Sequence, residues 1–324
     1  MDTLLISADF FGYPQEIVKA LESRGRSVKW FSDRPANDTK TKALVRLSPK
    51  LIKRKSADYF EKIFRQAAEY DVRDVIVIKG EALSTDMIKR MRALLPKARH
   101  TLYFWDSYRN MPEGSADKVG LFDRAFSFDL NDVATDSRLT YRPLFYIEQY
   151  ADVRETVQDI DLLFIGTAHS DRVKVLQRVS AAMPEGYELS KILYARSALL
   201  HRIQNLVNPS YRQTPEKDFI FKPIPKAEVQ SLIGRSKVVL DIERNVQTGF
   251  TMRTIEMLGS SRKLITTNPS ITKADFYHPQ NQYLIDRDNP VIDPEFLQTP
   301  WHPMEQRLLD HYSLSGWISD VFDY

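Results

Sequence analysis

The sequence predicts an α/β protein built from two successive open sheets with helices packed on them. Short apolar runs alternate with amphipathic helical segments along the chain. One run, 74–78, is almost continuous in β-branched residues, which is typical of a parallel strand buried on both faces. A polar segment at 148–160 separates two such series, and 324 residues are enough for two domains of ordinary size.

The first series opens with strand 3–7, the loop 8–14 and helix 15–23, which Gly25 ends. This opening is typical of a doubly wound sheet. Ser84 caps a later helix, but methionine stands three residues on, so we expect no full capping box there. The remaining predicted elements are strand 27–31, helix 56–70, strand 74–78, helix 84–95, strand 100–105 and strand 124–128.

The second series begins with strand 161–165 and the glycine-containing loop 166–172. Residues 304–322 form a tail with helical spacing and several aromatic residues. We therefore predict domains at 1–150 and 151–303 and a C-terminal helix at 304–324 that packs back on the first domain. Between the loop and the tail we expect helix 173–182, strand 188–192, helix 197–206, a weaker strand 218–221, helix 226–235 and strand 237–242.

The second series leads into the stretch 248–268, which reads as a loop, a short helix that Gly259 ends, and strand 263–267. A helix N-terminus presents free N–H groups and a positive dipole end, which suits a phosphate. Arg253 can grip a phosphate in a bidentate fork, and Glu256, on the same helix face, can accept hydrogen bonds from ribose hydroxyls. The alternative is an ordinary amphipathic helix whose charges face water.

Composition excludes several classes of protein. No cysteine is present, so disulfides, thiolate zinc sites and cysteine nucleophiles are absent. No run of about 20 apolar residues could span a membrane, and the N-terminus lacks the pattern of a signal peptide, so we expect a cytoplasmic location. The sequence also has no glycine pattern of the dinucleotide-binding or phosphate-loop type, and no nucleophile elbow.

The net charge of +3 is unevenly distributed, because residues 1–150 carry +5 and residues 151–324 carry −2. The basic excess is concentrated in the stretch 40–55, where apolar residues are interleaved with it. This pattern favours either peripheral contact with an anionic membrane or a solvated helix face. The balance is too mild for a dedicated nucleic-acid binder, so we expect no nucleic-acid partner.

Three segments of the second half, Phe164–Arg172, Gly249–Asn268 and Asn281–Asp288, resemble the donor domain of GT-B nucleotide-sugar glycosyltransferases. The chain looks most like the bacterial enzymes that build capsule, exopolysaccharide and lipopolysaccharide. The resemblance covers most of 160–290 but only the order of elements in 1–150. It implies two facing Rossmann-like domains, with a lipid-linked or growing glycan bound by the first and a nucleotide sugar bound by the second.

The resemblance implies that Glu256 binds the donor ribose and that Arg253 or a nearby amide holds the diphosphate. Many retaining members carry another glutamate seven or eight residues before the ribose-binding one, where this chain has Gly249 and Thr248, so the stereochemical outcome stays open. The other expected donor-binding residues lie in the loops or at the helix start: Gly166, His169, Arg172, Arg244, Gly249 and Thr251.

An inverting transfer needs a base for the acceptor hydroxyl, and a loop after a first-domain strand would supply it. Asp106 and Asp9 both fit that position, although each could instead cap a turn. Trp105, Arg109 and Tyr13 flank them as expected acceptor-binding residues.

Neutralising the leaving diphosphate requires positive charge. The chain has no Asp-x-Asp triplet, and Asp241-Ile-Glu243 is the nearest approach, so we expect cations and helix dipoles rather than a metal ion to do this. We therefore expect a metal-independent glycosyltransferase without a cofactor. Two alternatives remain open: a sugar-nucleotide-modifying enzyme such as an epimerase, and a non-catalytic binding protein of a polysaccharide assembly complex.

Overall fold

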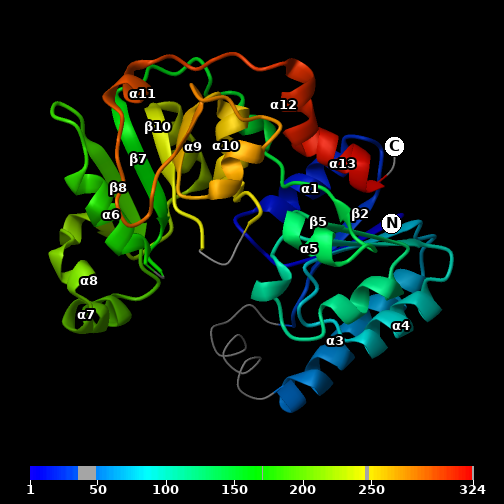
Figure 1. The fold of residues 1–324 in the computed structure, drawn as a ribbon. Coiled ribbons are helices and arrows are strands. Elements are labelled where there is room, and N and C mark those ends of the chain that lie inside the picture. The colour runs from blue at the N-terminus through cyan, green and yellow to red at the C-terminus, as the bar shows by residue number, and fades with distance from the viewer. Residues whose placement is uncertain (36–48, 170, 245–247, 323–324) are drawn as a thin grey trace. The chain divides into compact units, whose positions relative to one another are not determined.

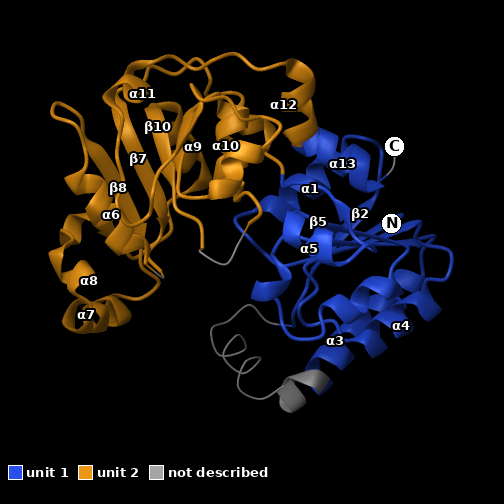
Figure 2. Ribbon diagram, viewed as in Figure 1, with its two compact units in different colours: residues 1–144, 314–324 blue, residues 145–313 orange. Residues whose placement is uncertain are grey.

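The computed structural model describes residues 1–35, 49–169, 171–244 and 248–322. Within these ranges the chain forms two compact units (Figures 1 and 2), one of residues 1–144 and 314–324 and one of residues 145–313. Each unit contains one six-stranded sheet in which every neighbouring pair of strands is parallel. The predicted α/β class with two sheets is therefore confirmed.

The sheet of unit 1 has the strand order β2-β1-β3-β4-β5-β6. The chain places β2 on one side of β1 and all later strands on the other side, so the connections change direction between β1 and β3. Apolar side chains from the strands, α3 and α4 form its main core. The strands are β1 (Thr3–Ser7), β2 (Val28–Ser32), β3 (Asp74–Ile78), β4 (Arg99–Phe104), β5 (Arg124–Ser127) and β6 (Thr140–Tyr141); the α-helices are α1 (Tyr13–Glu22), α3 (Pro49–Ala68), α4 (Thr85–Leu94), α5 (Leu130–Thr135) and α13 (Leu314–Phe322).

The sheet of unit 2 has the order β12-β11-β10-β7-β8-β9, so β7 lies at the point where the connections reverse. The strands are β7 (Ile160–Thr167), β8 (Leu189–Tyr194), β9 (Phe219–Ile220), β10 (Ser236–Asp241), β11 (Lys263–Thr266) and β12 (Gln282–Leu284). The α-helices are α6 (Arg172–Ala181), α7 (Ala198–Val207), α8 (Pro209–Gln213), α9 (Lys226–Gly234), α10 (Met252–Ser260), α11 (Pro294–Gln298) and α12 (Gln306–Tyr312).

The chain's tail forms two helices, and the second of them, α13, belongs to unit 1. Trp317 of α13 is completely buried and packs edge-on against Tyr103, with ring centroids 5.0 Å apart. Arg99 and Arg124 donate hydrogen bonds to the carbonyls of Phe322 and Asp320 at 3.0 and 2.9 Å. Because the last carbonyls of a helix carry partial negative charge, these cations stabilise the end of α13.

A buried arginine holds the segment that the sequence analysis treated as a linker. Arg262, which is only 2% exposed, donates hydrogen bonds to the carbonyls of Val153 (2.7 Å), Arg154 (3.1 Å) and Gly234 (2.7 Å). Tyr150 is also buried. The polar segment 148–160 is thus fixed to unit 2 by hydrogen bonds to its backbone.

Two details of the predicted helix ends are wrong. Helix α10 continues past Gly259 to Ser260, and Ser261 adopts the left-handed conformation (φ 51°) that we assigned to the glycine. In α4 a capping box is present after all, because the Met87 sulfur accepts a hydrogen bond from the Ser84 N–H while the Ser84 hydroxyl accepts one from the Met87 N–H.

Gly259 is required for packing rather than for ending the helix. A Cβ added at Gly259 would lie 2.4 Å from ring atoms of Tyr146, whose side chain is buried and donates a hydrogen bond to the carbonyl of Leu309. The ring cannot withdraw without breaking that hydrogen bond. The glycine therefore lets α10 lie directly against the Tyr146 ring.

We predict that Gly259→Ala destabilises the protein by about 1–3 kcal/mol, because overpacking of a buried contact costs this much. Alanine has the higher helix propensity, so a loss of stability would come from the clash alone. Thermal unfolding should show a midpoint lower by a few degrees. Gly120→Ala is the control, because its Cβ would make only an ordinary contact, 3.6 Å from the Arg138 guanidinium. Equal midpoints for the two variants would contradict this packing role.

Candidate functional site

In unit 2, the loops after β7, β8 and β10 leave the sheet at its carboxyl edge. Parallel pairing brings them together, since Thr167 at the end of β7 pairs with Tyr194 at the end of β8, and β10 pairs with β7 on the other side. Ligands of open α/β sheets bind outside this edge, where the connections reverse direction. The described donor-binding candidates of the sequence analysis lie at or close to this edge.

Arg172, the first residue of α6, ties the two central strands of this sheet together. Its Nε donates to the carbonyl of Ile242 (2.7 Å) after β10, and its Nη1 donates to the carbonyl of Thr167 (3.3 Å) in β7. Burial lowers its pKa, and among the described residues no carboxylate forms an ion pair with it. A Cβ at Gly166 would lie 3.1 Å from the Phe164 ring and 3.4 Å from the same Nη1 atom, so the glycine leaves room chiefly for the Phe164 ring.

His169, in the loop between Gly166 and Arg172, is surrounded by cations. Burial, together with charge repulsion from Arg172, Arg244 and Arg196, lowers the pKa of its imidazole to about 4. Arg244 and Arg196 are exposed and follow β10 and β8. The histidine is therefore neutral at pH 7, and three guanidinium groups from three loops create a field that favours an anion.

Arg196 is a residue that the sequence analysis missed. It lies 24 residues after Arg172 and 48 before Arg244, so no short motif connects the three. Their proximity follows from the strand order β10-β7-β8, which the sequence alone does not give. Its position in the loop between predicted strand 188–192 and predicted helix 197–206 was the available signal.

Asp241, the last residue of β10, and Glu243, two residues later, both accept hydrogen bonds from threonine hydroxyls of unit 2. The Asp241 carboxylate accepts hydrogen bonds from the hydroxyls of Thr251 (2.5 Å) and Thr254 (2.9 Å), which fixes the first turn of α10 to the end of β10. The Glu243 carboxylate accepts one from Thr267 (2.5 Å) and lies 3.6 Å from the Arg287 guanidinium. Burial raises the pKa of Glu243, with Asp241 adding to the effect.

Thr251 is the N-cap of α10, and its hydroxyl accepts a hydrogen bond from the Thr254 N–H at 3.2 Å. Gly249 is buried in the preceding loop, where its carbonyl accepts a hydrogen bond from the Asn268 amide. Both residues thus lie at the start of α10, close to the end of β10. Residues 245–247 of the same loop lie outside the described part of the chain.

Arg253 and Glu256, to which the sequence analysis gave separate roles, are bound to each other. Their Nη1 and Oε2 atoms are 2.7 Å apart, and the Glu256 side chain is almost fully buried. Tyr150 lies against both, and the pKa of its hydroxyl is raised by burial and then by the Glu256 charge. The buried tyrosine is a second partner that no spacing in the sequence predicted.

In unit 1, Asp106 follows β4 and forms an ion pair with Lys79, which follows β3. The Lys79 ammonium lies 2.6 Å from Asp106 and 3.0 Å from Glu81, and Arg34 lies 2.9 Å from Glu81. Although burial lowers it, the pKa of Lys79 is raised overall by Asp106 and Glu81. The Asp106 carboxylate is thus held by a permanently charged lysine.

The backbone at Lys79 is unusual, with φ at 70°, and Gly80 follows at 61°. Non-glycine residues rarely adopt this conformation, and such strain is common at functional sites. Lys118 lies below this turn, donates a hydrogen bond to the Gly80 carbonyl at 2.9 Å, and has a pKa that burial lowers to about 8. Neither lysine was a candidate from the sequence. The contact of Lys79 with Asp106 arises only from the parallel pairing of β3 with β4.

Asp9 and its aromatic neighbours lie in the loop after β1. Asp9 is exposed, as are Phe10 and Phe11, and the Phe10 ring lies 5.8 Å from the ring of Trp105, which follows β4. Phe11 also has positive φ, at 48°. Two loops of the same sheet edge thus present aromatic faces, which can stack on a sugar or an apolar chain.

The other two expected acceptor-binding residues differ in exposure. Arg109 is exposed beyond Trp105, whereas Tyr13 is only 3% exposed at the start of α1. Tyr13 therefore packs into the unit, and Phe10 and Phe11 are the aromatic groups that this loop presents. Nearby, burial raises the pKa of Asp132 to about 6, and the neighbouring Asp129 caps α5.

Three further observations concern a metal ion, a membrane span and the basic stretch 40–55. In the described ranges, no cluster of three or more histidine, aspartate or glutamate side chains could hold a metal ion. None of the helices in the described part of the chain has the length and apolar composition that a membrane span requires. In the stretch 40–55, residues 40–48 and the side chains of 49–53 lie outside the description, and Arg54 and Lys55 are exposed on α3.

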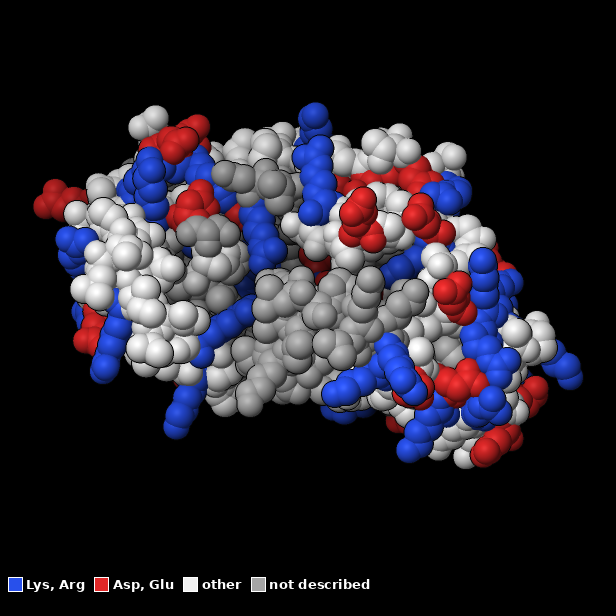
Figure 3. Space-filling model, turned by 90° about the horizontal axis from the view of Figure 1, so that it is seen from below, with Lys and Arg blue, Asp and Glu red and all other residues white. Residues whose placement is uncertain are grey.

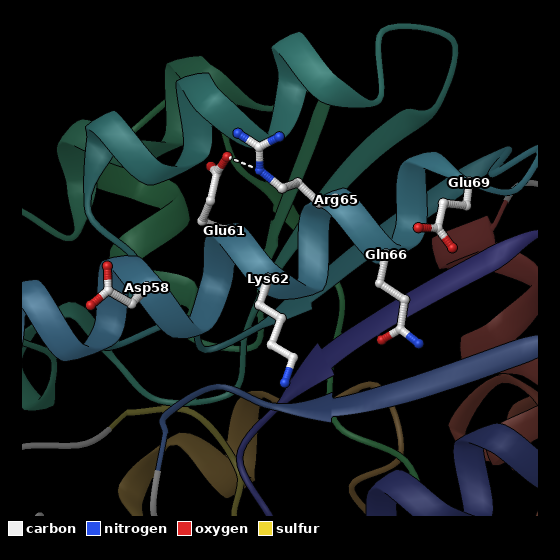
Figure 4. Close-up of a pocket in the computed structure, with 6 residues that line it drawn as sticks. All are labelled: Asp58, Glu61, Lys62, Arg65, Gln66 and Glu69. Atoms are coloured by element: carbon white, nitrogen blue, oxygen red, sulfur yellow. Dashed lines mark ion pairs between the residues drawn. The ribbon is translucent and has the colours of Figure 1, made fainter.

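A shallow depression along α3 is lined by side chains of both charges (Figure 4): Asp58, Glu61, Lys62, Arg65, Gln66 and Glu69. Glu61 lies 2.7 Å from Arg65 and 2.9 Å from Arg90 of α4, and these contacts lower the pKa of Glu61 to about 2. All six residues belong to one helix, and their charges largely neutralise one another. The depression therefore lacks the converging groups of a ligand site.

The chain matches no protein-family model and no curated protein sequence, but its fold is shared by solved structures. It is similar to a glycosyltransferase from Rickettsia africae, at 10% sequence identity over 99% of this chain and 97% of that one, with a TM-score of 0.64. It is similar to HepE of Anabaena in complex with UDP and glucose, at 11% identity over 100% and 99%, with a TM-score of 0.61. It is also similar to the apo structure of OtsA, at 11% identity over 99% of each chain, with a TM-score of 0.60.

These likenesses extend over both units, and they confirm the fold that the resemblance implied. The protein has a GT-B-like two-domain fold with C-terminal helices, which is the fold of nucleotide-sugar glycosyltransferases. At about one residue in ten identical, they show the fold and leave substrate and reaction to be argued from the site.

We predict that Arg172→Gln raises the pKa of His169, because Arg172 has the largest effect of the three cationic charges named above. Titration of the imidazole C–H signals by NMR measures this directly, with His169→Gln to assign the signal. Arg178→Gln is the matched control, because Arg178 lies on the same helix but is paired with Asp288. An unchanged His169 pKa in Arg172→Gln would show that the arginine does not create the local field.

Proposed function

We propose that the protein is a glycosyltransferase that moves a sugar from a nucleoside-diphosphate donor to a glycan or lipid-linked acceptor. The observation that carries the proposal is the arginine cluster in unit 2. Arg172, Arg196 and Arg244 converge on one loop, and in the described part of the chain no carboxylate forms an ion pair with any of them. A diphosphate with two or more negative charges is the ligand that such a cluster suits.

In this proposal, the donor diphosphate lies over the Gly166 loop and the N-terminal turns of α6 and α10. Arg172 is preorganised by its two carbonyl contacts, whereas Arg196 and Arg244 are exposed and can move to the ligand. His169 and Thr251 border the same loops, and the buried Gly249 forms the floor of the turn before α10. No metal ion has a role, because guanidinium groups and helix dipoles supply the positive charge.

Glu256 binds the ribose hydroxyls in this proposal, and Arg253 orients it. The ion pair with Arg253 and the contact with Tyr150 hold the carboxylate in one orientation before the donor arrives. A carboxylate oriented in this way can accept two hydrogen bonds from a vicinal diol. Arg253 is then a positioning residue for Glu256 as well as a candidate contact for the diphosphate.

For the transfer itself, Asp106 takes the proton of the acceptor hydroxyl, with Asp9 as the alternative base. The Lys79 ammonium lies 2.6 Å from the Asp106 carboxylate and holds it in one orientation after β4. Trp105, Phe10 and Phe11 provide aromatic surface for the acceptor, and Arg109 offers a charge for an anionic group. Tyr13 supports this loop from beneath.

The acceptor class rests on the resemblance to enzymes of bacterial surface polysaccharides and on this aromatic surface. HepE, which shares the fold, is described in complex with UDP and glucose, which makes UDP the first nucleotide to test. Incubation with a nucleotide sugar alone separates the proposal from its alternatives. An epimerase would convert the donor without an acceptor, and a binding protein would transfer no sugar to any acceptor.

We predict that the protein binds a nucleoside diphosphate and that Arg172→Ala weakens binding by about tenfold or more, since a charge-assisted hydrogen bond contributes about 1.5–3 kcal/mol. Glu256→Ala should weaken nucleotide binding severely, but should leave the affinity for inorganic pyrophosphate unchanged, because the ribose is missing there. Calorimetry with UDP, GDP, CDP and ADP measures both, with Arg178→Ala as control. Unchanged nucleotide affinity in Glu256→Ala would remove the ribose assignment.

We predict that Asp106→Asn abolishes sugar transfer without weakening donor binding, because an amide cannot accept the proton. Turnover is measured with radiolabelled donor, and donor affinity by calorimetry on the same preparation. Asp9→Asn, in the neighbouring exposed loop, is the matched variant and should retain turnover. The opposite pattern, with transfer retained in Asp106→Asn and lost in Asp9→Asn, would assign the base to Asp9.

A further inference from the structure

Helix α7 has an unusual orientation, because it buries its polar side and exposes its apolar side. His201 and Asn205, one turn apart, face the unit, where His201 is only 4% exposed and its ring lies 4.2 Å from the ring of Phe219. Five large aliphatic side chains of the same helix are 46–77% exposed: Leu199, Leu200, Ile203, Leu206 and Val207. In a helix buried by its hydrophobic face, the opposite arrangement is expected.

These five side chains form one continuous stripe. At 100° per residue, positions 199, 200, 203, 206 and 207 fall within about 120° of the helix circumference, opposite His201 and Asn205. The largest contiguous apolar patch on a typical monomeric protein covers about 300–600 Å² and is often functional. Isolated exposed side chains, such as Val157 and Val291 elsewhere in unit 2, do not form such a stripe.

The border of the stripe is basic. Exposed Arg202 lies on α7 itself, and exposed Arg212 donates hydrogen bonds to the carbonyls of Asn205 and Leu206 at its C-terminal end. Residues 195–226 contain six lysines and arginines but only two acidic residues, although residues 151–324 together carry a charge of −2. On the left of Figure 3, the surface over the α7–α8 end of unit 2 is largely uncharged, and basic side chains outnumber acidic ones around it.

We propose that α7 is a membrane-surface helix that inserts its apolar stripe between the headgroups of an anionic lipid bilayer. An apolar helix face with cations along its border is the pattern of helices that lie in the plane of a membrane interface. The charge favours lipid over a second copy of this chain, because a twofold contact would bring the basic border against itself. This surface is separate from the stretch 40–55, and the proposal does not depend on the proposed enzymatic activity.

The test is sedimentation of the full-length protein with vesicles of phosphatidylcholine alone and of phosphatidylcholine with phosphatidylglycerol. Wild-type protein should partition onto the anionic vesicles, and Leu199→Ser/Val207→Ser should reduce the partition coefficient about tenfold or more, since two buried aliphatic groups are lost. The matched control Val157→Ser/Val291→Ser removes two equally exposed side chains of the same unit and should stay within about twofold of wild type. Arg202→Gln should reduce binding to the anionic vesicles but not to the neutral ones.

All the substituted side chains are exposed, so circular dichroism should confirm that each variant folds. Absence of wild-type binding to anionic vesicles, or equal binding by Leu199→Ser/Val207→Ser, would overturn the proposal. Sedimentation equilibrium provides the other decisive result. A wild-type dimer that the same double substitution converts to a monomer would show that a second copy covers α7 and would also overturn it.

Discussion

The candidate site in unit 2 depends on the two hydrogen bonds that Arg172 donates to the carbonyls of Thr167 and Ile242. Backbone carbonyls at the carboxyl edge of a sheet that no neighbouring strand pairs with need another hydrogen-bond donor. A guanidinium group satisfies two of them at once and connects β7 with β10. Because carbonyls carry no formal charge, the arginine keeps its full charge for a ligand, which an ion pair with a carboxylate would have cancelled.

At the carboxyl edge of the sheet in unit 1, the charged side chains form ion pairs with one another, whereas Arg172 in unit 2 binds backbone carbonyls. Lys79 binds Asp106 and Glu81, and Arg34 binds Glu81 and Asp33, so each of these two cations is paired with two carboxylates. The left-handed backbone at Lys79 points to a geometry that the surrounding structure enforces. A network in which every cation is paired suits a site that must hold a carboxylate in place, whereas a cluster of cations without ion-pair partners suits a site that must bind an anion. The two edges therefore differ in the way that the proposed donor and acceptor roles require.

The sequence could predict the strands, because parallel buried strands leave near-continuous apolar runs such as 74–78. It could also place the candidate residues in loops after strands, since this follows from chain order alone. It could not predict which loops become neighbours, because the orders β2-β1-β3-β4 and β10-β7-β8 are tertiary facts. For this reason the partnership of Lys79 with Asp106 was missed, as were the roles of Arg196 and Tyr150. Gly259 shows the same limit, because its function depends on a tyrosine 113 residues earlier in the chain.

Helix α7 shows that a periodic pattern identifies an apolar face but does not say which medium covers it. The spacing of Leu199, Ile203 and Leu206 would ordinarily place this face in a core. Here the aromatic rings of Phe219 and Tyr211 pack on His201, so the polar side of the helix is the side that the unit holds. An exposed apolar stripe is costly in water, and these five side chains stay exposed although their helix packs on unit 2 through His201. The stripe is therefore better explained by a surface outside the unit that it contacts, and the basic residues along its border indicate that this surface is negatively charged.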